Sequence, residues 1–224
     1  ILTEIVAPFP VFSSGDRSNT RPIRALINLS SFKQNVALIK QQIGTSDIIC
    51  VVKADAYGHG LIEISKAAGD HRLAVAVPEE LNCIRAAGLK NQVWVLEGPF
   101  SLECFMGSTH TVWVIHSVWQ LSLMRQALEQ GVVTELLVCI KFDTGMHRLG
   151  FNPNEIPELI NVLKSFSSLI KVESIFSHLA ASDEATHDDF THKQISHFEK
   201  LSNQLTKGLN YPIDKHLLNT NGII

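Results

Sequence analysis

The sequence predicts an α/β fold, because short apolar runs alternate with helical patterns from Arg21 to the last residue. The apolar runs are continuous rather than alternating, as expected for strands that are buried on both faces of a parallel sheet. A doubly wound sheet that binds dinucleotides would carry a G-x-G-x-x-G turn after a strand, and the sequence contains none. Seven or eight strand–helix units in a row therefore favour a (β/α)8 barrel of the TIM type.

The expected strands are short runs rich in Val, Ile, Leu and Trp, residues that suit a pleated and buried surface. They cover residues 25–29, 48–53, 73–77, 93–98, 111–116, 135–143 and 172–180. A further strand is expected to lead into the segment HLLNTNGII at residues 216–224. The tryptophans Trp94, Trp113 and Trp119 fall within apolar patterns, so we expect them in the core.

A helical pattern follows each expected strand. The helices are expected at residues 30–42, 60–69 and 78–88, in a short segment after 98, around 118–128 and 156–163, and at 188–207. Ser30 or Ser31 is expected to cap the first helix, and Pro78 and Gly88 suit the start and the end of the third. On the last helix the residues that recur at helical spacing are Phe190, Gln194, Phe198, Leu201 and Leu205.

Residues 1–20 are expected to form a lead segment ahead of one domain at 21–224. Pro8, Pro10 and the polar stretch SSGDRSNT interrupt any regular pattern there. The segment has no basic region followed by an apolar core, so it does not resemble a signal peptide. No apolar run approaches the roughly 20 residues that span a bilayer, and we therefore expect a cytoplasmic protein without a membrane partner.

The composition is that of an ordinary globular protein, with 45% hydrophobic and 18% charged residues among 224. The net charge of −3 and the lack of a basic stripe argue against nucleic acid as a partner. Four widely spaced cysteines show neither a zinc spacing nor a disulfide framework, so reduced thiols are expected. His187, His192 and His197 recur every five residues, which does not place them on one helical face, and no metal site is predicted.

In a barrel of this type the chemistry lies at the C-terminal ends of the strands. Polar side chains at these positions are Lys53, Asp55, Tyr57, Glu97, His116, Lys141, Asp143, Arg148, His178, Asn219 and Thr220. Glu97 and His116 are interpreted as polar residues that simply begin loops. Lys53, Lys141 and His178 are stronger candidates, because each directly follows or ends a buried-strand pattern.

A lysine at the end of a buried strand serves as an ion-pair partner, a phosphate contact or a Schiff-base nucleophile. Pyridoxal phosphate requires such an amine together with groups that bind its phosphate. Tyr57 lies four residues after Lys53, and Thr220 lies where barrels often bind phosphate, near strands 7 and 8. The residues alone leave the three uses of Lys53 open.

Two long motifs and three supporting segments resemble those of alanine racemases, in the same order. The segment VVKADAYGHG (51–60) resembles the pyridoxal-phosphate attachment signature, and KFDTGMHRLGF (141–151) resembles the second signature of that family. SHLAASDE (177–184), HLLNTNGI (216–223) and RPIRALINLSSFKQNV (21–36) resemble further family segments. The resemblance runs from Arg21 to the last residue.

The resemblance implies six cofactor-binding residues, which are Lys53, Tyr57, Arg148, His178, Asn219 and Thr220. Lys53 matches the lysine that forms a Schiff base with pyridoxal phosphate and later acts as one of two bases on the substrate α-carbon. Tyr57 matches a tyrosine that binds the phosphate. Thr220 stands where the family commonly has a serine that binds the phosphate, and Asn219 is its neighbour.

The resemblance also implies four catalytic residues, which are Lys53, Arg148, Lys141 and His178. Arg148 matches an arginine near the phenolic oxygen of the cofactor and the substrate carboxylate. Lys141 matches a lysine that is carbamylated in many members and holds that arginine. His178 matches a histidine that binds the arginine facing the pyridine nitrogen.

Two parts of the family site have no match in this sequence. The opposite-face base is a tyrosine of a second, mostly β domain, and neither Tyr57 nor Tyr211 stands in that context. The arginine that faces the pyridine nitrogen would follow NTNGII. By the resemblance, residues 25–29 belong with the sheet of the second domain, so the barrel lacks its last strand. We therefore expect an N-terminal racemase barrel that racemises poorly by itself.

The resemblance implies a racemase that depends on pyridoxal phosphate and interconverts L- and D-alanine by two-base proton transfer. Such an enzyme supplies D-alanine for peptidoglycan, as a homodimer in the bacterial cytoplasm. The main alternative is a non-enzymatic barrel that carries pyridoxal phosphate. Further alternatives are a related racemase or decarboxylase for another amino acid, and a barrel without cofactor in which Lys53 is structural.

Overall fold

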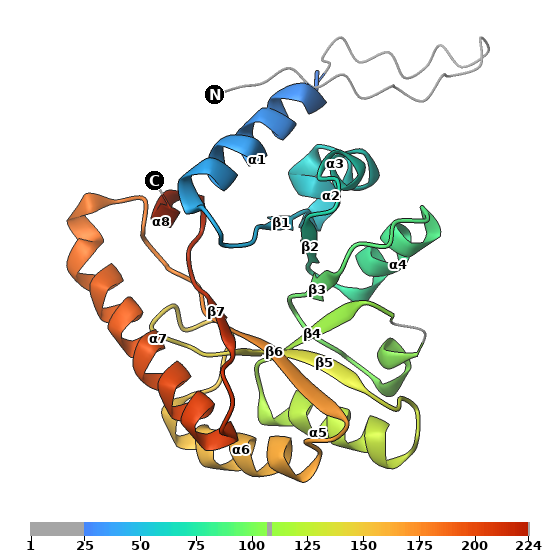
Figure 1. The fold of residues 1–224 in the computed structure, drawn as a ribbon, viewed down its shortest axis with the longest axis vertical. Helices are drawn as coiled ribbons and strands as arrows, with labels where there is room; N and C mark the ends of the chain where they lie inside the picture. Colours follow the sequence, from blue (N-terminus) through green and yellow to red (C-terminus); the bar gives the residue numbers. More distant parts are fainter. Residues whose placement is uncertain (1–24, 107–108, 224) are drawn as a thin grey trace. The chain divides into compact units, whose positions relative to one another are not determined.

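The computed structural model describes residues 25–106 and 109–223, which form two compact units. Unit 1 contains the described residues up to Val75 together with Glu79–Asn91, and unit 2 contains Ala76–Pro78 and the described residues from Gln92 onward. The predicted lead segment, 1–20, lies outside the described residues. Figure 1 colours the elements along the chain.

Unit 1 is built around two parallel strands. Its elements are α1 (Leu29–Ile43), β1 (Ile49–Val51), α2 (Lys53–Gly58), α3 (Leu61–Ala67), β2 (Arg72–Val75) and nearly all of α4 (Pro78–Ala86). Strands β1 and β2 pair with Ile49 opposite Arg72 and Val51 opposite Ala74. Leu73, Ala74 and Val75 are buried, as the continuous apolar run predicts.

The first predicted element of unit 1 differs from the expectation. Leu26 and Ile27 are single bridge positions rather than part of a strand over 25–29, and helix α1 already begins at Leu29. Its N-cap is Asn28, whose side chain accepts hydrogen bonds from the backbone N–H groups of Ser30 and Ser31. The cap predicted at Ser30 or Ser31 is therefore wrong, because the asparagine just before them satisfies the free N–H groups at the start of the helix.

Unit 2 contains five parallel strands among its described residues. They are β3 (Val93–Val95), β4 (Thr111–Ile115), β5 (Leu136–Lys141), β6 (Ile170–Phe176) and β7 (Asp214–His216), and each pairs with the next along the chain. The helices are α5 (Val118–Glu129), α6 (Ile156–Ser165), α7 (Asp188–Leu209) and α8 (Thr220–Ile223), with short 3-10 turns at Leu102–Phe105, Pro153–Glu155 and Ala185–His187. Parallel strands in chain order in both units confirm the α/β prediction.

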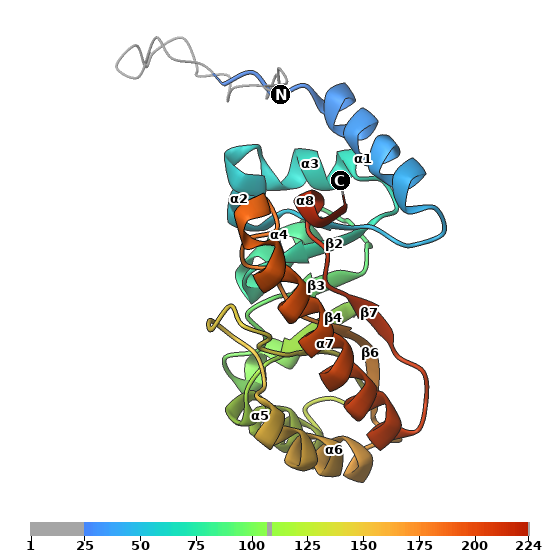
Figure 2. The same cartoon turned by 90° about the vertical axis from the view of Figure 1, so that its left-hand side faces the viewer.

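The long helices of unit 2 follow one another around its strands. Helix α6 contacts both α5 and α7, and Figures 1 and 2 show this order beside β5, β6 and β7. Trp94 of β3 and Trp113 of β4 are each 1% exposed, and Phe105 packs edge-on against Trp113 at 5.3 Å between ring centroids. Trp119 is 55% exposed on α5, so the expectation of a core position is wrong for this residue.

Within the described part of the chain, three features are missing, namely a helix that could span a membrane, a cluster of metal ligands and a disulfide. None of its helices combines the length and the apolar character needed to cross a membrane. No cluster of three or more His, Cys, Asp or Glu side chains there could hold a metal ion. All four cysteines are free thiols.

Candidate functional site

Lys53 directly follows the first strand of unit 1. Strand β1 ends at Val51, and the next residue, Val52, is buried and donates its N–H to the carbonyl of Ala74 at 2.8 Å. Lys53 is half-buried and begins α2. The structure thus places the lysine at the C-terminal end of a parallel strand, as predicted. The predicted burial of this strand is wrong in part, because Cys50 is buried but Ile49 is only half-buried and Val51 is 42% exposed.

The backbone turns left-handed immediately after this lysine. Ala54, Asp55, Ala56 and Tyr57 have φ values of 52° to 57° and ψ values of 37° to 53°, which are the angles of a left-handed helix. For L-residues this conformation costs about 1–2 kcal/mol per residue, or about 4–8 kcal/mol for four. The sequence carries no local signal for this turn. Strain of this size persists only where neighbouring groups hold it, and such places are often functional.

Backbone hydrogen bonds hold the left-handed turn internally. The N–H of Ala56 donates to the carbonyl of Val52 at 2.9 Å, and the N–H of Gly60 donates to the carbonyl of Asp55 at 2.9 Å. His59 donates its N–H to the carbonyl of Ala56 at 3.1 Å. Each such bond contributes about 1 kcal/mol net, so these three alone do not offset the strain.

Two carboxylates from outside the turn's backbone complete its support. Oδ1 of Asp55 accepts the N–H of Leu61, the first residue of α3, at 2.7 Å. Oε1 of Glu80, in the first turn of α4, accepts the N–H of Ala54 at 2.6 Å. The turn is therefore attached to both α3 and α4.

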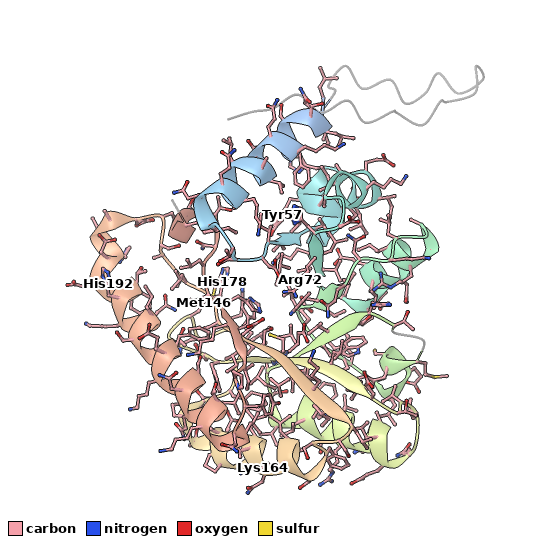
Figure 3. All side chains as sticks on the ribbon, in the orientation of Figure 1. Tyr57, Arg72, Met146, Lys164, His178 and His192 are labelled. Carbon is pink, nitrogen blue, oxygen red and sulfur yellow. The ribbon has the colours of Figure 1, made fainter. Side chains whose placement is uncertain are left out.

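The left-handed turn presents Tyr57 to solvent. This side chain is 59% exposed, and Figure 3 labels it on α2, with Arg72 labelled on β2 of the same unit. Partial burial of the phenol raises its pKa above the ordinary value, so the hydroxyl keeps its proton and donates hydrogen bonds at neutral pH. Lys53 and Tyr57 thus lie on one rigid turn as an amine and a phenol.

In unit 2 the segment 141–151 folds into a closed loop after β5. Phe142 and Phe151 are both fully buried and form a parallel bridge. The N–H of Asp143 donates to the carbonyl of Phe151 at 3.1 Å, and the N–H of Phe151 donates to the carbonyl of Lys141 at 2.8 Å. Gly150 lies at the closure with φ of 138°, and a Cβ there would be 2.3 Å from the nitrogen of Asp143. Only glycine fits this close approach of two backbones.

The closed loop carries Lys141 at its base and Arg148 near its tip. Lys141 is 5% exposed, and its Nζ lies 5.0 Å from the centre of the Phe176 ring, within cation–π range. Arg148 is exposed, and its guanidinium makes no hydrogen bond or ion pair within the described chain. The loop therefore offers one buried cation and one exposed cation.

Asp143 stabilises the same loop from inside. Its Oδ1 accepts the N–H groups of Gly145 and His147, each at 3.0 Å, and its Oδ2 lies 3.1 Å from Nδ1 of His147. Partial burial would raise the pKa of this carboxyl, but the hydrogen bonds from Gly145 and His147 outweigh it and leave the pKa below its usual value.

A buried polar network joins the loop after β5 to the loop after β6. Ser177 Oγ donates to the carbonyl of Phe142 at 2.8 Å, so the hydroxyl of Thr144, also at 2.8 Å, donates to Ser177. Gln194 of α7, which is fully buried, donates to Thr144 Oγ1 at 3.4 Å and to the carbonyl of His178 at 3.1 Å. Its Oε1 accepts the N–H of Ala180 at 2.9 Å. One glutamine thus fixes the loops that carry Arg148 and His178.

His178 is half-buried directly after Ser177, and Figure 3 labels it together with Met146 of the closed loop. The loop after β6 is also attached to the end of β7, because Ser182 Oγ donates to Asn219 Oδ1 at 2.9 Å. The same oxygen accepts the N–H of Gly222 at 2.9 Å. Thr220 is exposed at the start of α8. Asn219 therefore supports the turn that presents the Thr220 hydroxyl.

Glu97 and His116 have contacts that suit their interpretation as loop residues. Nε2 of His116 lies 3.1 Å from the carbonyl oxygen of Glu97. Gln120 donates to that carbonyl at 2.6 Å and accepts the N–H of His116 at 3.0 Å. These bonds join the ends of β3 and β4.

The predicted residues fall into two groups. Lys53 and Tyr57 share one turn of unit 1. In unit 2, networks of hydrogen bonds connect the loops and strand ends that carry Lys141, Arg148, His178, Asn219 and Thr220. Sequence reasoning missed Glu80, Ser182 and Gln194 as supporting residues. Only Gln194 left a signal, as a polar residue at a core position of an apolar helical stripe.

Comparison with known proteins identifies the relatives of the chain. The family described as "Alanine racemase, N-terminal domain" matches residues 27–224. The alanine racemases of Halothermothrix orenii and Pseudomonas taetrolens are both 38% identical, over 92% and 80% of this chain and 55% and 50% of their own lengths. A solved alanine racemase of Clostridium difficile 630 in complex with cycloserine is 30% identical, with a TM-score of 0.76 over 88% of this chain and 55% of that chain. The chain thus spans about half the length of these relatives, and the likeness confirms the predicted barrel fold.

Proposed function

Because the chain belongs to the family of alanine racemase N-terminal domains, we propose that it carries the lysine side of the catalytic site of an amino-acid racemase that depends on pyridoxal phosphate. The observation that supports this most strongly is the position of Lys53, at a strand end and next to a strained turn that also presents Tyr57. A barrel strand end followed by a rigid turn is where a catalytic amine belongs. The proposed substrates are L- and D-alanine.

The donor set of the chain suits pyridoxal phosphate. Lys53 supplies a half-buried amine, Tyr57 an exposed phenol and Thr220 an exposed hydroxyl. Arg148 supplies an exposed guanidinium that has no ionic partner in the described chain. An amine binds the cofactor carbonyl carbon, hydroxyl groups donate to phosphate oxygens, and a guanidinium binds a carboxylate in a bidentate way. The cofactor, when bound, supplies the electron-withdrawing ring that allows the substrate α-proton to leave.

Each residue has a separate role in this proposal. Lys53 binds the cofactor and then moves a proton at the substrate α-carbon on one face. Tyr57 and Thr220 bind the phosphate, with Asn219 positioning Thr220. Arg148 binds the substrate carboxylate.

Two residues of unit 2 act at one remove from the substrate. Lys141 positions Arg148 from the base of the same loop, either as an ammonium or as a carbamate. His178 positions an arginine that faces the ring nitrogen.

Racemisation requires an acid–base group on each face of the α-carbon, and Lys53 serves only one. We propose that the second group is a tyrosine of a mostly β domain and that the active form is a homodimer. The physiological role is the supply of D-alanine for peptidoglycan in the bacterial cytoplasm. The second candidate function, a carrier of pyridoxal phosphate without catalysis, uses Lys53 and Tyr57 but gives the exposed Arg148 no substrate to bind.

The test measures cofactor binding and proton exchange separately. With pyridoxal phosphate added, the chain should show a visible absorption band that is lost in Lys53→Ala and kept in Lys66→Ala. Lys66 is a suitable control because it is an exposed lysine of the same unit, paired with Glu63 at 3.1 Å. In D2O, a one-sided base should exchange the α-proton of one alanine enantiomer much faster than it racemises either.

The outcomes separate the candidates. A Lys53-dependent band with enantiomer-selective exchange supports the racemase. A band without exchange of either enantiomer supports the carrier and overturns the racemase proposal. A band that survives Lys53→Ala refutes both.

A further inference from the structure

Both peptide groups that flank Lys53 are held by hydrogen bonds to groups outside the lysine. The peptide before it is held through the carbonyl of Val52, which accepts the N–H of Ala56 at 2.9 Å. The peptide after it is held through the N–H of Ala54, which donates to Oε1 of Glu80 at 2.6 Å. Two fixed peptide planes determine the direction of the Cα–Cβ bond between them. The backbone therefore sets the direction in which the Lys53 side chain starts.

The second of these peptides is also where the chain changes its handedness. The run of positive φ values begins at Ala54, with φ of 53°, and Lys53 itself is outside this run. Ala54 is the second residue of α2, and the first four N–H groups of a helix have no acceptor within the helix, so the place of the acceptor is open to a group from outside. A side-chain carboxylate from another helix takes this place, and a charged acceptor makes a stronger hydrogen bond than a neutral one.

Glu80 is well placed to hold a fixed position. It lies in the first turn of α4, a helix that also carries the buried side chains of Leu81 at 3% and Ile84 at 0% exposure. Pro78, the first residue of α4, is buried as well. A carboxylate on a helix anchored by such side chains is a rigid support, whereas an exposed loop carboxylate would not be. At the other end of the turn, Asp55 accepts the N–H of Leu61 and attaches it to α3.

We propose that Glu80 is a positioning residue for Lys53. Its carboxylate holds the Lys53–Ala54 peptide in the orientation that starts the left-handed turn, and so directs the lysine amine toward its target. This inference rests on the proposed function of Lys53 as the cofactor-binding amine. Glu80 itself touches neither substrate nor cofactor in this scheme.

Three substitutions separate the role of the hydrogen bond from other effects. Glu80→Ala removes the acceptor, and Glu80→Gln keeps an acceptor oxygen at the same distance along the side chain without the charge. Glu79→Ala is the matched control, since Glu79 is the neighbouring acid on the same helix and is exposed. We expect Glu80→Ala to be impaired, Glu80→Gln to be largely rescued, and Glu79→Ala to behave as the parent chain.

The first readout needs no cofactor. Hydrogen exchange of the Ala54 amide in the 224-residue chain should be about tenfold or more faster in Glu80→Ala, the change expected when a charge-assisted hydrogen bond is lost. Exchange in β2 should stay unchanged, which distinguishes local release of the turn from unfolding of unit 1. Equal exchange of Ala54 in Glu80→Ala and Glu79→Ala would overturn the inference.

The second readout is the affinity for pyridoxal phosphate, measured by titration of the visible band. Glu80→Ala should bind the cofactor about tenfold more weakly, and Glu80→Gln should lose much less. If the parent chain shows no Lys53-dependent band, the proposed function fails, while the exchange of Ala54 still decides whether Glu80 holds the peptide. If the parent chain binds and Glu80→Ala binds equally well, the proposed function stands and the positioning role is refuted. Should Glu80→Ala fail to fold, Glu80→Asp, whose shorter side chain withdraws the acceptor oxygen from the Ala54 N–H, is compared with Glu79→Asp, and equal affinity and equal exchange in those two refute the positioning role.

Discussion

Substitution of Gly150 by alanine should open the closed loop that presents Arg148. A Cβ at this position would lie 2.3 Å from the nitrogen of Asp143, 2.4 Å from the carbonyl carbon of Phe142 and 2.8 Å from its oxygen. All three atoms are backbone atoms of a segment that pairs with Phe151, so none moves aside as a flexible side chain would. The φ of 138° adds strain that only glycine avoids.

The expected loss has two parts. A non-glycine residue in such a backbone conformation costs about 1–3 kcal/mol. Forcing a methyl group into a packed site costs about 1–3 kcal/mol more. The Gly150→Ala chain should therefore lose about 4 kcal/mol of the free energy of unfolding of unit 2.

Gly131→Ala is the matched control for this prediction. Gly131 has φ of 67°, and a Cβ added there would meet no atom within 4 Å, so its substitution tests the backbone strain alone. We expect a loss of about 1 kcal/mol there. The difference of about 3 kcal/mol between the two variants measures the contact between the two backbones together with the greater backbone strain at Gly150.

Urea unfolding followed by tryptophan fluorescence is the appropriate assay, because all three tryptophans belong to unit 2. At a slope of about 2 kcal/mol/M, a difference of 3 kcal/mol separates the two midpoints by about 1.5 M. Variants that unfold within about 0.3 M of each other would refute the tight pairing of Phe142 with Phe151 and the argument for glycine at position 150.

Three further predictions concern single side chains. Gln194→Met keeps the volume but removes the hydrogen bonds that Gln194 makes with the Ala180 N–H and the His178 carbonyl, so unit 2 should lose about 2–4 kcal/mol and the Ala180 amide should exchange faster. A loss below about 1 kcal/mol would mean that water replaces the glutamine. The pKa of Asp143 is lower in the folded chain than its unfolded value of about 3.9, so its contribution to stability is complete above that pH and is lost as the pH falls through the folded pKa. Below about pH 4, the urea concentration at the unfolding midpoint should therefore decrease in the parent chain and decrease less steeply in Asp143→Asn. Burial raises the pKa of Cys139 to about 12, so a thiol reagent at pH 8 should label the exposed Cys83 and leave Cys139 unmodified until the chain unfolds.

The strands were predictable because burial on both faces demands continuous apolar runs. The segments expected at 111–116 and 135–143 appear as β4 at Thr111–Ile115 and β5 at Leu136–Lys141. The ends of these strands are less predictable from sequence than their positions, since hydrogen bonding to a neighbouring strand, and not apolar character, decides where pairing stops. The segment 172–180 shows this, because β6 ends at Phe176 and Ser177 begins the polar network that holds the next loop.

The left-handed turn after Lys53 could not be predicted from local sequence. Ala54, Ala56 and Tyr57 have no intrinsic preference for positive φ, and short polar residues such as Asp55 are the only non-glycine type that adopts it readily. The acceptor that holds the turn belongs to Glu80, which is 26 residues away from Ala54 along the chain. A conformation stabilised by so distant a group is a property of the tertiary structure. The segment VVKADAYGHG predicts a role for Lys53 but does not predict the left-handed backbone that follows it.

Gln194 illustrates how a polar residue in an apolar stripe can report a functional neighbourhood. Its position on the buried face of α7 follows from helical spacing, together with Phe198, Leu201 and Leu205. A buried amide must find partners, and backbone groups of the loops after β5 and β6 are unpaired by regular structure and therefore need them. The loops that carry Arg148 and His178 are irregular, so a buried glutamine behind them is the expected counterpart of that irregularity. By the same reasoning, the carboxylate of Glu80 is the counterpart of the strained turn after Lys53. Under the proposed function, Glu80 and Gln194 bind no ligand themselves and hold the backbone of residues that do.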